Sequence, residues 1–369
     1  MIVDLYAGPG GWDEGLRLLG LATVGIEWDA AACDTAHAAG HLRIQADVST
    51  YCIEAFAGAT GLVASPPCQA WSMAGKRAGE VDRARAHALV DAYADGADQP
   101  GGGWADDRSH HAAQPVRWVR DLRPRWVALE QVPPVLGLWQ HIAERLRRWG
   151  YSTWTGVLNS ADYGVPQTRE RAFLLARLGG SVAPPEPTHA RQPAGPDLLG
   201  SVRAPWVSMA EALGWVGVDR PARTVCGDRS PRWAYPQASS VATGWTLNRR
   251  TVSKGGCGSM YPTPVVEVER PAPTVTGQAG NQWVFERPAT TVLGDPRIGR
   301  PGHKDRDGGE SQFEEGALKV TALEATILQS FRPDYPWRGN KSQQFQQIGN
   351  AVPPLLAAAV CRALIGGGS

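Results

Sequence analysis

The strongest candidate for chemistry in this sequence is Cys68, which lies in the stretch Ala64-Ser-Pro-Pro-Cys-Gln-Ala-Trp-Ser72. Two prolines before a cysteine at the end of an expected strand indicate a rigid, exposed turn, whereas an inert cysteine is usually buried inside a helix or strand. A thiolate held in such a turn is suited to attack on an electron-poor carbon. We therefore interpret Cys68 as a nucleophile, with a structural cysteine as the alternative.

A nucleophile of this kind needs an acid, and the sequence offers one at another strand end. Glu130 ends the expected strand 126–130, where its carboxyl group can act as a general acid. Farther along, Gln167-Thr-Arg-Glu-Arg171 supplies two arginines that can withdraw electron density from a substrate. The predicted catalytic set is Cys68, Glu130, Arg169 and Arg171.

Glycines and acids at three earlier strand ends indicate a site for a nucleoside-like ligand. The stretch Asp4-Leu-Tyr-Ala-Gly-Pro-Gly-Gly11 follows the first expected strand, and its glycines let the backbone pass close to a ligand at the carboxyl edge of a sheet. At the next strand end, Glu27 can accept hydrogen bonds from ribose hydroxyls and Trp28 can stack on a purine, while a third strand end presents Asp47 to an exocyclic amine. Taken singly, each acid is equally well explained as a helix N-cap.

Apolar runs alternate with helical patterns over residues 1–177, which predicts strands joined by crossover helices in a parallel sheet, an α/β fold. The expected strands are 2–6, 22–26, 62–64, 126–130, 152–158 and 172–176, and the expected amphipathic helices are 12–19 and 142–149. From residue 180, frequent Pro and Gly breaks indicate irregular β structure, and helical periodicity returns at residue 321, with an apolar helix over 357–365. We therefore predict a catalytic and cofactor-binding domain over 1–179, a smaller β-rich domain over 180–320, and a segment over 321–369 that returns to the first domain.

Two local features stand apart from this predicted arrangement of strands, helices and domains. A phrase recurs as DRPARTV over 219–225, ERPAPTV over 269–275 and ERPATTV over 286–292, which predicts a turn and a short strand used three times, as scaffold or as a binding surface. The segment 95–107, DGADQPGGGWADD, is rich in glycine and acid, so we expect a mobile surface loop.

The composition is typical of a globular protein, with 43% hydrophobic and 20% charged residues and no apolar run near the roughly 20 residues that a membrane span needs. The first expected strand begins at Ile2, so we expect no signal peptide and a cytoplasmic protein. Six scattered cysteines, with no Cys-x-x-Cys pair and no histidines at zinc spacing, predict reduced thiols and no metal site. The net charge of +1 argues against a general polycation but allows a local basic face over 220–254, or equally an ordinary solvated surface.

Taken together and in this order, the motifs resemble those of the cytosine-C5 DNA methyltransferase family from one end of the chain to the other. DLYAGPGG over 4–11 is similar to the family's first motif, GIEWD over 25–29 and the Asp47 strand to its second and third, SPPCQAWS over 65–72 to its nucleophile motif, and QIGNAVPP over 347–354 to its closing motif. The resemblance implies a Rossmann-like class I methyltransferase sheet with flanking helices, a smaller β-rich target-recognition domain, and S-adenosylmethionine as methyl donor, with S-adenosylhomocysteine as product and no metal. The residues expected at the cofactor are Asp4, Tyr6, Ala7, Gly8, Gly10, Gly11, Glu27, Trp28, Asp47, Val48, Pro66, Asn350 and Val352.

The same resemblance implies a reaction on cytosine in duplex DNA. Cys68 attacks carbon 6 while Glu130 contacts N3 and the amino group, and Arg171, with Arg169 nearby, supports O2; carbon 5 then takes the methyl group, and proton loss and elimination of the cysteine regenerate the ring. Because the ring is approached from its face, the cytosine must be flipped out of the duplex. A loop over 70–81 is expected to close over the DNA, and the region 180–320 to read the sequence through arginine contacts to guanine. The residues expected at the DNA are Gln69, Ser72, Lys76, Arg77, Arg229, Arg232, Arg249 and Arg250.

We further expect a monomer that acts in a bacterial cell or a phage-infected host, with a cognate restriction endonuclease as a candidate partner. One departure from the family lies in the acid motif, which reads Glu130-Gln-Val132 where the family usually has Glu-Asn-Val, and it affects only the supporting hydrogen bonds.

Three alternatives share parts of this sequence pattern. A tRNA cytosine methyltransferase shares the motifs but is disfavoured by the long region between Arg171 and Thr321. A catalytically silent DNA-binding relative is disfavoured because Cys68, Glu130 and Arg171 are intact. A methyltransferase for adenine or an exocyclic amine needs an Asp/Asn-Pro-Pro-Tyr/Phe arrangement where Ser65-Pro-Pro-Cys68 stands.

Overall fold

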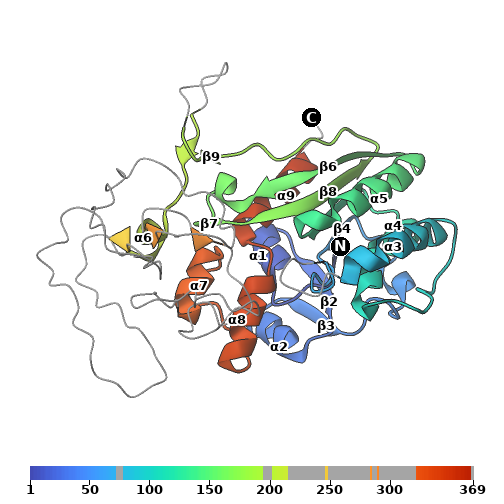
Figure 1. The fold of residues 1–369 in the computed structure, drawn as a ribbon, viewed down its shortest axis with the longest axis horizontal. Helices are drawn as coiled ribbons and strands as arrows, with labels where there is room; N and C mark the ends of the chain where they lie inside the picture. The colour runs from blue at the N-terminus through green and yellow to red at the C-terminus, as the bar shows by residue number, and fades with distance from the viewer. Residues whose placement is uncertain are drawn as a thin grey trace, which may run out of the picture.

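The computed structural model describes residues 1–71, 78–193, 202–214 and 321–366, together with the pairs 246–247, 283–284 and 289–290. Its centre is a sheet of seven strands in the order β3-β2-β1-β4-β5-β8-β6 (Figure 1). These strands are β1 Ile2–Leu5, β2 Thr23–Glu27, β3 Leu42–Gln45, β4 Gly61–Ala64, β5 Trp126–Gln131, β6 Tyr151–Asn159 and β8 Glu170–Leu178. All six strands whose ranges were predicted from the sequence are present, with ends that differ by at most two residues.

The sheet is mixed, which corrects the expectation of a parallel sheet. Strands β3, β2, β1, β4 and β5 pair in parallel, whereas β8 runs antiparallel to both β5 and β6. Between β6 and β8 the chain forms only the short helix η4 Ser160–Tyr163 and the strand β7 Gln167–Thr168. A connection this short cannot cross over the sheet, so the two long strands pair as antiparallel neighbours.

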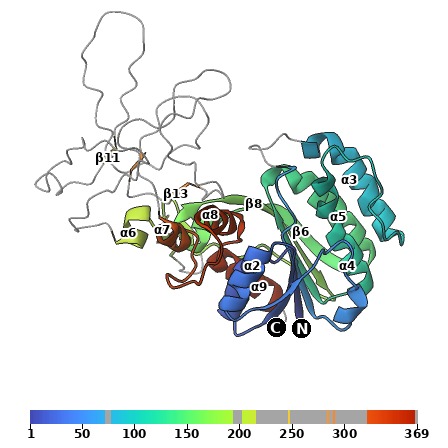
Figure 2. The same cartoon turned by 90° about the horizontal axis from the view of Figure 1, so that it is seen from below.

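Helices cover both faces of this sheet (Figure 2). The helices of the described residues are α1 Gly11–Arg17, α2 Ala30–Ala38, α3 Ala78–Ala94, α4 Gln114–Leu122, α5 Leu136–Arg148, α6 Met209–Leu213, α7 Ala322–Leu328, α8 Lys341–Asn350 and α9 Pro354–Gly366, with the short helices η1 Ile53–Phe56, η2 Asp107–Ala112 and η3 Pro133–Val135. Of these, α6 packs against α7, and α7 against α8, to one side of the sheet (Figure 2). Because side chains alternate along a strand, Val3 and Leu5 of β1 join the core under α3, α4 and α5, whereas Ile2 joins a second core under α1 and α9.

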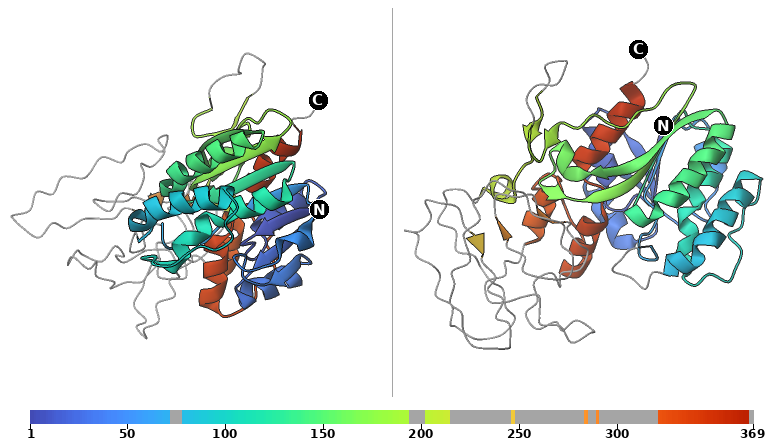
Figure 3. Two further views of the ribbon diagram at one scale, coloured as in Figure 1. Left: turned by 90° about the vertical axis from the view of Figure 1, so that its right-hand side faces the viewer. Right: turned by 45° about the horizontal axis from the view of Figure 1, so that its top comes forward.

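The C-terminal helices lie beside the first elements of the chain, although they are distant in sequence (Figure 3). Helix α9 packs against α1, and Leu356 and Val360 of α9 share a core with Trp12 and Leu16 of α1. The stretch Lys341–Gly366 is long and apolar enough to cross a membrane, but 67% of its most apolar window is buried inside the protein. It also divides into α8 and α9 at residues 351–353, as core helices of a globular fold do.

The glycine-rich segment 95–107 is tied to neighbouring helices at several points. The Asp82 carboxylate of α3 accepts hydrogen bonds from the amides of Ala105 and Asp106 at 2.8 and 3.1 Å, and Arg117 of α4 donates to the carbonyl oxygen of Asp98 at 2.9 Å. The segment expected to be mobile is therefore anchored to α3 and α4.

The described parts of the region 180–320 contain the short helix α6 and short strands. The strands are β9 His189–Ala190, β10 Ala204–Pro205, β11 Thr246–Leu247, β12 Trp283–Val284 and β13 Ala289–Thr290. Strand β13 lies in the third copy of the recurring phrase, where a short strand was predicted, and pairs in parallel with β7. The predicted turn before it lies outside the described residues. The other two copies lie outside the described residues.

Replacing Gly15 tests the packing of α1 against α9. A Cβ atom at Gly15 would lie 2.5 Å from the Cβ atom of Ala357 and 2.8 Å from the carbonyl oxygen of Pro354, so the helices would have to separate. We expect Gly15→Ala to lower the free energy of unfolding by about 1–3 kcal/mol, measured by urea titration. Gly137→Ala is the matched control, because its Cβ atom would meet only the Arg83 side chain at 3.6 Å. Equal stability of the two variants would contradict this account of the packing.

Candidate active site

Parallel pairing brings the predicted site residues to one edge of the sheet. The residues after β1, the end of β2, and the residues after β3 and β4 all lie at carboxyl ends of parallel neighbours, and Glu130 lies near the carboxyl end of β5. Along this edge the order is Asp47, Glu27, Tyr6, Cys68 and Glu130, which follows the strand order β3-β2-β1-β4-β5. The predicted nucleophile and acid are therefore at one end of a row, and the predicted nucleoside contacts are at the other.

The glycine turn after β1 is held from below by Glu27. One oxygen of this carboxylate, Oε2, accepts a hydrogen bond from the Gly8 amide at 2.8 Å, and Oε1 accepts one from the Asp29 amide at 2.7 Å. Burial raises the pKa of Glu27, and the backbone hydrogen bonds oppose that rise. Ala7, which is buried, donates its amide to the Ile26 carbonyl at 3.0 Å, so the whole turn is fixed to β2.

The three glycines of the turn have different surroundings. Gly8 has a φ of 54°, and a Cβ atom there would meet nothing within 4 Å, so this residue faces open space. A Cβ atom at Gly10 would lie 2.6 Å from the Tyr335 hydroxyl, and one at Gly11 would lie 2.3 Å from the Val352 carbonyl oxygen. The expectation that all three approach a ligand is therefore corrected: Gly10 and Gly11 admit the C-terminal segment, and only Gly8 opens outward.

Asp4 is a second correction. Its side chain is fully buried, because it points to the face of β1 opposite to Val3 and Leu5. Neither carboxyl oxygen has a hydrogen-bond partner within the described residues, and burial, reinforced by the nearby Asp13, raises its pKa well above the usual range. Asp4 thus lies buried beneath the turn and presents no accessible surface at the edge.

The other candidates for the nucleoside end are exposed to different degrees. Trp28 is 73% exposed beside Glu27, whereas Val48 is 2% exposed and packs into the core under α3, α4 and α5. Asp47 is half-buried, and its Oδ1 accepts hydrogen bonds from the amide and the hydroxyl of Ser49 at 2.8 and 2.7 Å. Trp28 and Asp47 are therefore accessible at the edge, while the Val48 side chain is not.

The C-terminal segment completes the wall beside the glycine turn. The Tyr335 hydroxyl donates to the Pro9 carbonyl, and Gln329 donates to the Ala351 carbonyl at 2.6 Å. Val352 is buried against Gly11, and Asn350 is exposed at the end of α8.

The turn that carries Cys68 is fixed to β5 through Gln131. Its Nε2 donates to the carbonyl oxygen of the buried Pro66 at 2.7 Å, and its Oε1 accepts from the Val132 amide at 2.7 Å. Ser65 accepts a further hydrogen bond from the Trp12 indole at 2.9 Å. The residue that departs from the family pattern therefore connects the acid strand to the nucleophile turn, a contact that sequence reasoning did not anticipate.

Cys68, Glu130 and Arg171 lie close together at the end of this row. The Arg171 Nε lies 3.1 Å from Glu130 Oε1, and Glu130 is only 5% exposed. Cys68 is half-buried, and burial raises the pKa of its thiol while the positive charge of Arg171 opposes the rise. The chemistry of the group is a thiol whose ionisation depends on a neighbouring guanidinium, beside a buried carboxyl group.

Arg169 has a different environment from Arg171. It is 2% exposed, and its Nη1 donates to the Gly349 carbonyl of α8 at 2.9 Å. Burial lowers its pKa to about 9, and Arg171 adds to that shift. The expectation of two substrate-facing arginines is therefore narrowed to Arg171, while Arg169 joins the catalytic end to the C-terminal segment.

Sequence reasoning also missed a histidine pair on η2. The Tyr6 hydroxyl lies 3.0 Å from Nδ1 of His111, and the rings of His110 and His111 lie 4.1 Å apart. Two adjacent histidines shortly after the glycine-rich segment were the available signal.

The candidate DNA contacts lie mostly outside the described residues. Gln69 is half-buried, and its Oε1 has no partner within the described residues. The candidates Ser72, Lys76, Arg77, Arg229, Arg232, Arg249 and Arg250 lie outside them. Among the described residues, no group of three or more His, Cys, Asp or Glu side chains is arranged to hold a metal ion.

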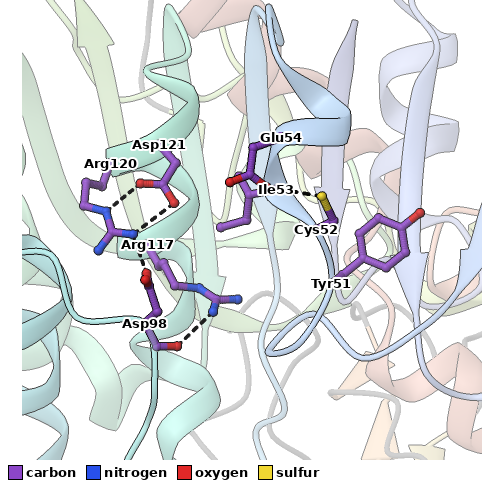
Figure 4. Close-up of a pocket in the computed structure, with 8 residues that line it drawn as sticks. All are labelled: Tyr51, Cys52, Ile53, Glu54, Asp98, Arg117, Arg120 and Asp121. Carbon is purple, nitrogen blue, oxygen red and sulfur yellow. Dashed lines mark hydrogen bonds and ion pairs between the residues drawn. The ribbon is translucent and has the colours of Figure 1, made fainter.

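A surface cavity of about 290 Å³ lies away from Cys68, between η1 and α4 (Figure 4). Its lining residues are Tyr51, Cys52, Ile53, Glu54, Asp98, Arg117, Arg120 and Asp121. Arg120 pairs with Asp98 and Asp121, and Arg117 donates to the Asp98 carbonyl, so these charged groups satisfy one another. Nothing in this cavity calls for a ligand.

The comparisons with known proteins agree with this geometry. The family model of C-5 cytosine-specific DNA methylases matches residues 1–93 and 101–366. The Type II methyltransferase M1.HphI of Haemophilus parahaemolyticus is 27% identical, over 98% of this chain and 86% of its own, and M.NaeI of Lentzea aerocolonigenes is 26% identical, over 97% and 73%. The fold is similar to that of the S. pombe Dnmt2 methyltransferase, with a TM-score of 0.57 and 15% identity over 99% of this chain and 98% of that chain.

The reactivity of Cys68 tests the electrostatics of the site. Removing the charge with Arg171→Gln should raise the pKa of the thiol further, and each added unit lowers the thiolate fraction by about tenfold. We expect alkylation of Cys68 by iodoacetamide at pH 8 to slow by roughly two- to tenfold, followed by mass spectrometry of the Cys68 peptide. Arg171→Lys, which keeps the charge, is the control. An unchanged rate in Arg171→Gln would show that the guanidinium does not act on the thiol.

Proposed function

Because the chain belongs to the C-5 cytosine-specific DNA methylase family and is a DNA (cytosine-5-)-methyltransferase, we propose that Cys68 is its covalent nucleophile, acting on a cytosine flipped out of duplex DNA. The observation that carries this proposal is the juxtaposition of Cys68 with the Arg171 and Glu130 pair at the ends of neighbouring strands. The proximity of a guanidinium favours the thiolate, and the buried carboxyl group is close enough to act on the same ring.

The proposed steps follow from the roles of these three residues. The Cys68 thiol gives its proton to solvent or a base, and the thiolate adds to carbon 6 of cytosine while the carboxyl group of Glu130 donates a proton to N3. Arg171 stabilises the electron density at O2, and carbon 5 becomes the nucleophilic centre that accepts the methyl group. Water or a base then takes the carbon 5 proton, the cysteine leaves carbon 6 as a thiolate, and N3 returns its proton to Glu130, which restores the ring, the thiolate and the carboxyl group.

The residues at the other end of the row fit S-adenosylmethionine. Glu27 and Asp47 are carboxylates, which suit ribose hydroxyls and amines and oppose an anionic phosphate, and Gly8 opens to free space between them and Cys68. We assign cofactor contacts to Tyr6, Gly8, Glu27, Trp28 and Asp47, with Pro66, Asn350 and the backbone of Val48 and Val352 at the margins. When bound, S-adenosylmethionine supplies an electrophilic methyl group on a positively charged sulfur.

The proposal extends to the cellular context. The Type II names of the relatives support a restriction and modification system, so we infer a cognate restriction endonuclease that recognises the same DNA sequence. We infer that residues 180–320 read that sequence, that residues 321–369 belong with the catalytic domain 1–179, and that Gln69, Ser72, Lys76, Arg77 and the four arginines between 229 and 250 contact the DNA. We also propose that the protein acts as a monomer in the cytoplasm of a bacterium or phage-infected host.

The decisive experiment traps the covalent step. We expect the wild-type protein to form a stable adduct with duplex DNA that contains 5-fluorocytosine, because the fluorine cannot leave carbon 5 as a proton does. Cys68→Ala should form no adduct on a denaturing gel and should incorporate no labelled methyl groups into DNA. It should still bind DNA. Cys52→Ala, which changes an exposed cysteine elsewhere, is the matched control and should behave as wild type. Substantial methyl transfer by Cys68→Ala would contradict the assignment of Cys68 as the nucleophile.

The substrate class is tested with the same assay. We expect methyl incorporation into duplex DNA and none into tRNA, and bisulfite sequencing of DNA from expressing cells should show a single sequence context. Preferential methylation of tRNA would replace the DNA proposal with its alternative.

The contact between Gln131 and Pro66 predicts an effect on the rate of catalysis. Gln131→Glu keeps the acceptor for the Val132 amide but replaces the Nε2 donor with an oxygen that repels the Pro66 carbonyl. Because a misplaced nucleophile slows attack, we expect kcat to fall by roughly tenfold or more while KM for DNA stays within about twofold. Gln140→Glu, a matched change of an exposed amide to a carboxylate on α5, reports the effect of the charge alone. A rise in KM without a fall in kcat would assign Gln131 to binding.

A further inference from the structure

The contact between Tyr6 and His111 takes no part in the reaction steps proposed above. The tyrosine hydroxyl lies 3.0 Å from His111 Nδ1, and the two rings meet nearly edge to face, with centroids 5.4 Å apart and planes at 78°. Tyr6 has a φ of 57°, a conformation that non-glycine residues rarely adopt and that persists only where surrounding contacts hold it. Both side chains are half-buried, so part of each remains accessible at the edge of the sheet.

The strand order places this pair between the two ends of the row. Glu27 and Asp47 follow β2 and β3, Cys68 follows β4, and Tyr6 follows β1, which lies between β2 and β4. If the adenosine of the methyl donor lies at Glu27 and Asp47, as proposed above, its sulfur must reach toward Cys68 across the end of β1. The sulfonium then lies beside Tyr6 and His111, and this step of the argument rests on the proposed function.

The surroundings of His111 keep it uncharged. Burial lowers its pKa to about 4, and the neighbouring His110 adds to the shift. The titratable groups that face His111 are Tyr6 after β1, Asp47 from the loop after β3, and His110 of η2. Tyr6 also faces Glu27 of β2, Tyr93 of α3 and Arg117 of α4. His110 in turn faces Asp107 and contacts Gln114 and the Trp104 ring. Burial also raises the pKa of Tyr6, so the phenol keeps its proton, and its hydroxyl forms a hydrogen bond with Nδ1 of the neutral imidazole.

We propose that His111, held by the Tyr6 hydroxyl, determines selectivity between the cationic methyl donor and its neutral thioether product. A neutral ring beside the sulfonium adds no repulsion, so this position does not oppose binding of the donor relative to S-adenosylhomocysteine. A positive charge at the same position repels the sulfonium but not the thioether, and therefore favours the product.

Substitution of His111 tests this proposal, with binding of S-adenosylmethionine and S-adenosylhomocysteine measured separately by isothermal titration calorimetry at pH 7.5. His111→Lys should weaken binding of the donor by about tenfold more than binding of the product, because only the donor carries the opposing charge. His111→Gln is the matched control, since its neutral side chain can accept the Tyr6 hydrogen bond, and the ratio of the two Kd values should stay within about threefold of wild type. Equal weakening of both ligands by His111→Lys would overturn the proposal and leave His111 a structural residue.

A second measurement uses the wild-type protein and keeps the proposal testable when His111→Lys does not fold. Since the pKa of His111 lies near 4, its ring stays neutral from pH 8 down to pH 6, and the wild-type ratio of the two Kd values should be constant over that range. A ratio that shifts toward the product between pH 7.5 and 6 would mean that the ring titrates near its ordinary pKa, and would overturn the claim that it is held neutral. Failure of the wild-type protein to bind either ligand would instead contradict the cofactor assignment itself, so the two failures are distinguishable.

Discussion

Parallel hydrogen bonding from β3 through β5 is the constraint on which the rest of the structure depends. It fixes the carboxyl ends of five strands at one edge, and the short strands leave their following residues little freedom to lie elsewhere. Residues as distant in sequence as Asp47 and Glu130 therefore form one row. The order along the row also separates the two halves of the reaction, with the carboxylates that suit a nucleoside at one end and the thiol at the other.

Hydrogen bonds between backbone and side chains keep this edge of the sheet rigid. Glu27, a predicted ligand contact, also takes part in these hydrogen bonds. Glu27 holds Gly8, and Gln131 holds Pro66, each through a bond of 2.7 or 2.8 Å to a residue on a neighbouring strand end. Such contacts reduce the reorganisation needed when a substrate arrives, which is the usual source of catalytic advantage in a fixed site. The same edge buries ionisable groups, and burial raises the pKa of both Glu27 and Cys68.

The C-terminal segment contributes to the same rigidity through contacts with residues 180 or more positions earlier in the chain. Tyr335 contacts the Pro9 carbonyl, Val352 packs against Gly11, and Gly349 accepts a hydrogen bond from Arg169. These three contacts reach the glycine turn and the strand that carries Arg171. A chain whose first and last described elements share one core couples the integrity of its site to the folding of both ends.

The sequence alone determined the positions of the strands, the nucleophile turn and the glycine turn, because local patterns of apolar residues, prolines and glycines act over a few neighbours. The resemblance of the motifs to those of the family could likewise be recognised from the sequence. Only the tertiary structure decided that β8 is antiparallel, that Asp4 faces the buried side, that Gly10 and Gly11 serve packing against residues 335 and 352, and that Arg169 is turned toward α8. It alone also revealed the contacts of Gln131 with Pro66 and of Tyr6 with His111. The physical reason is that the direction of a side chain and the identity of its partner depend on residues 65 to 341 positions away, and no local pattern encodes them.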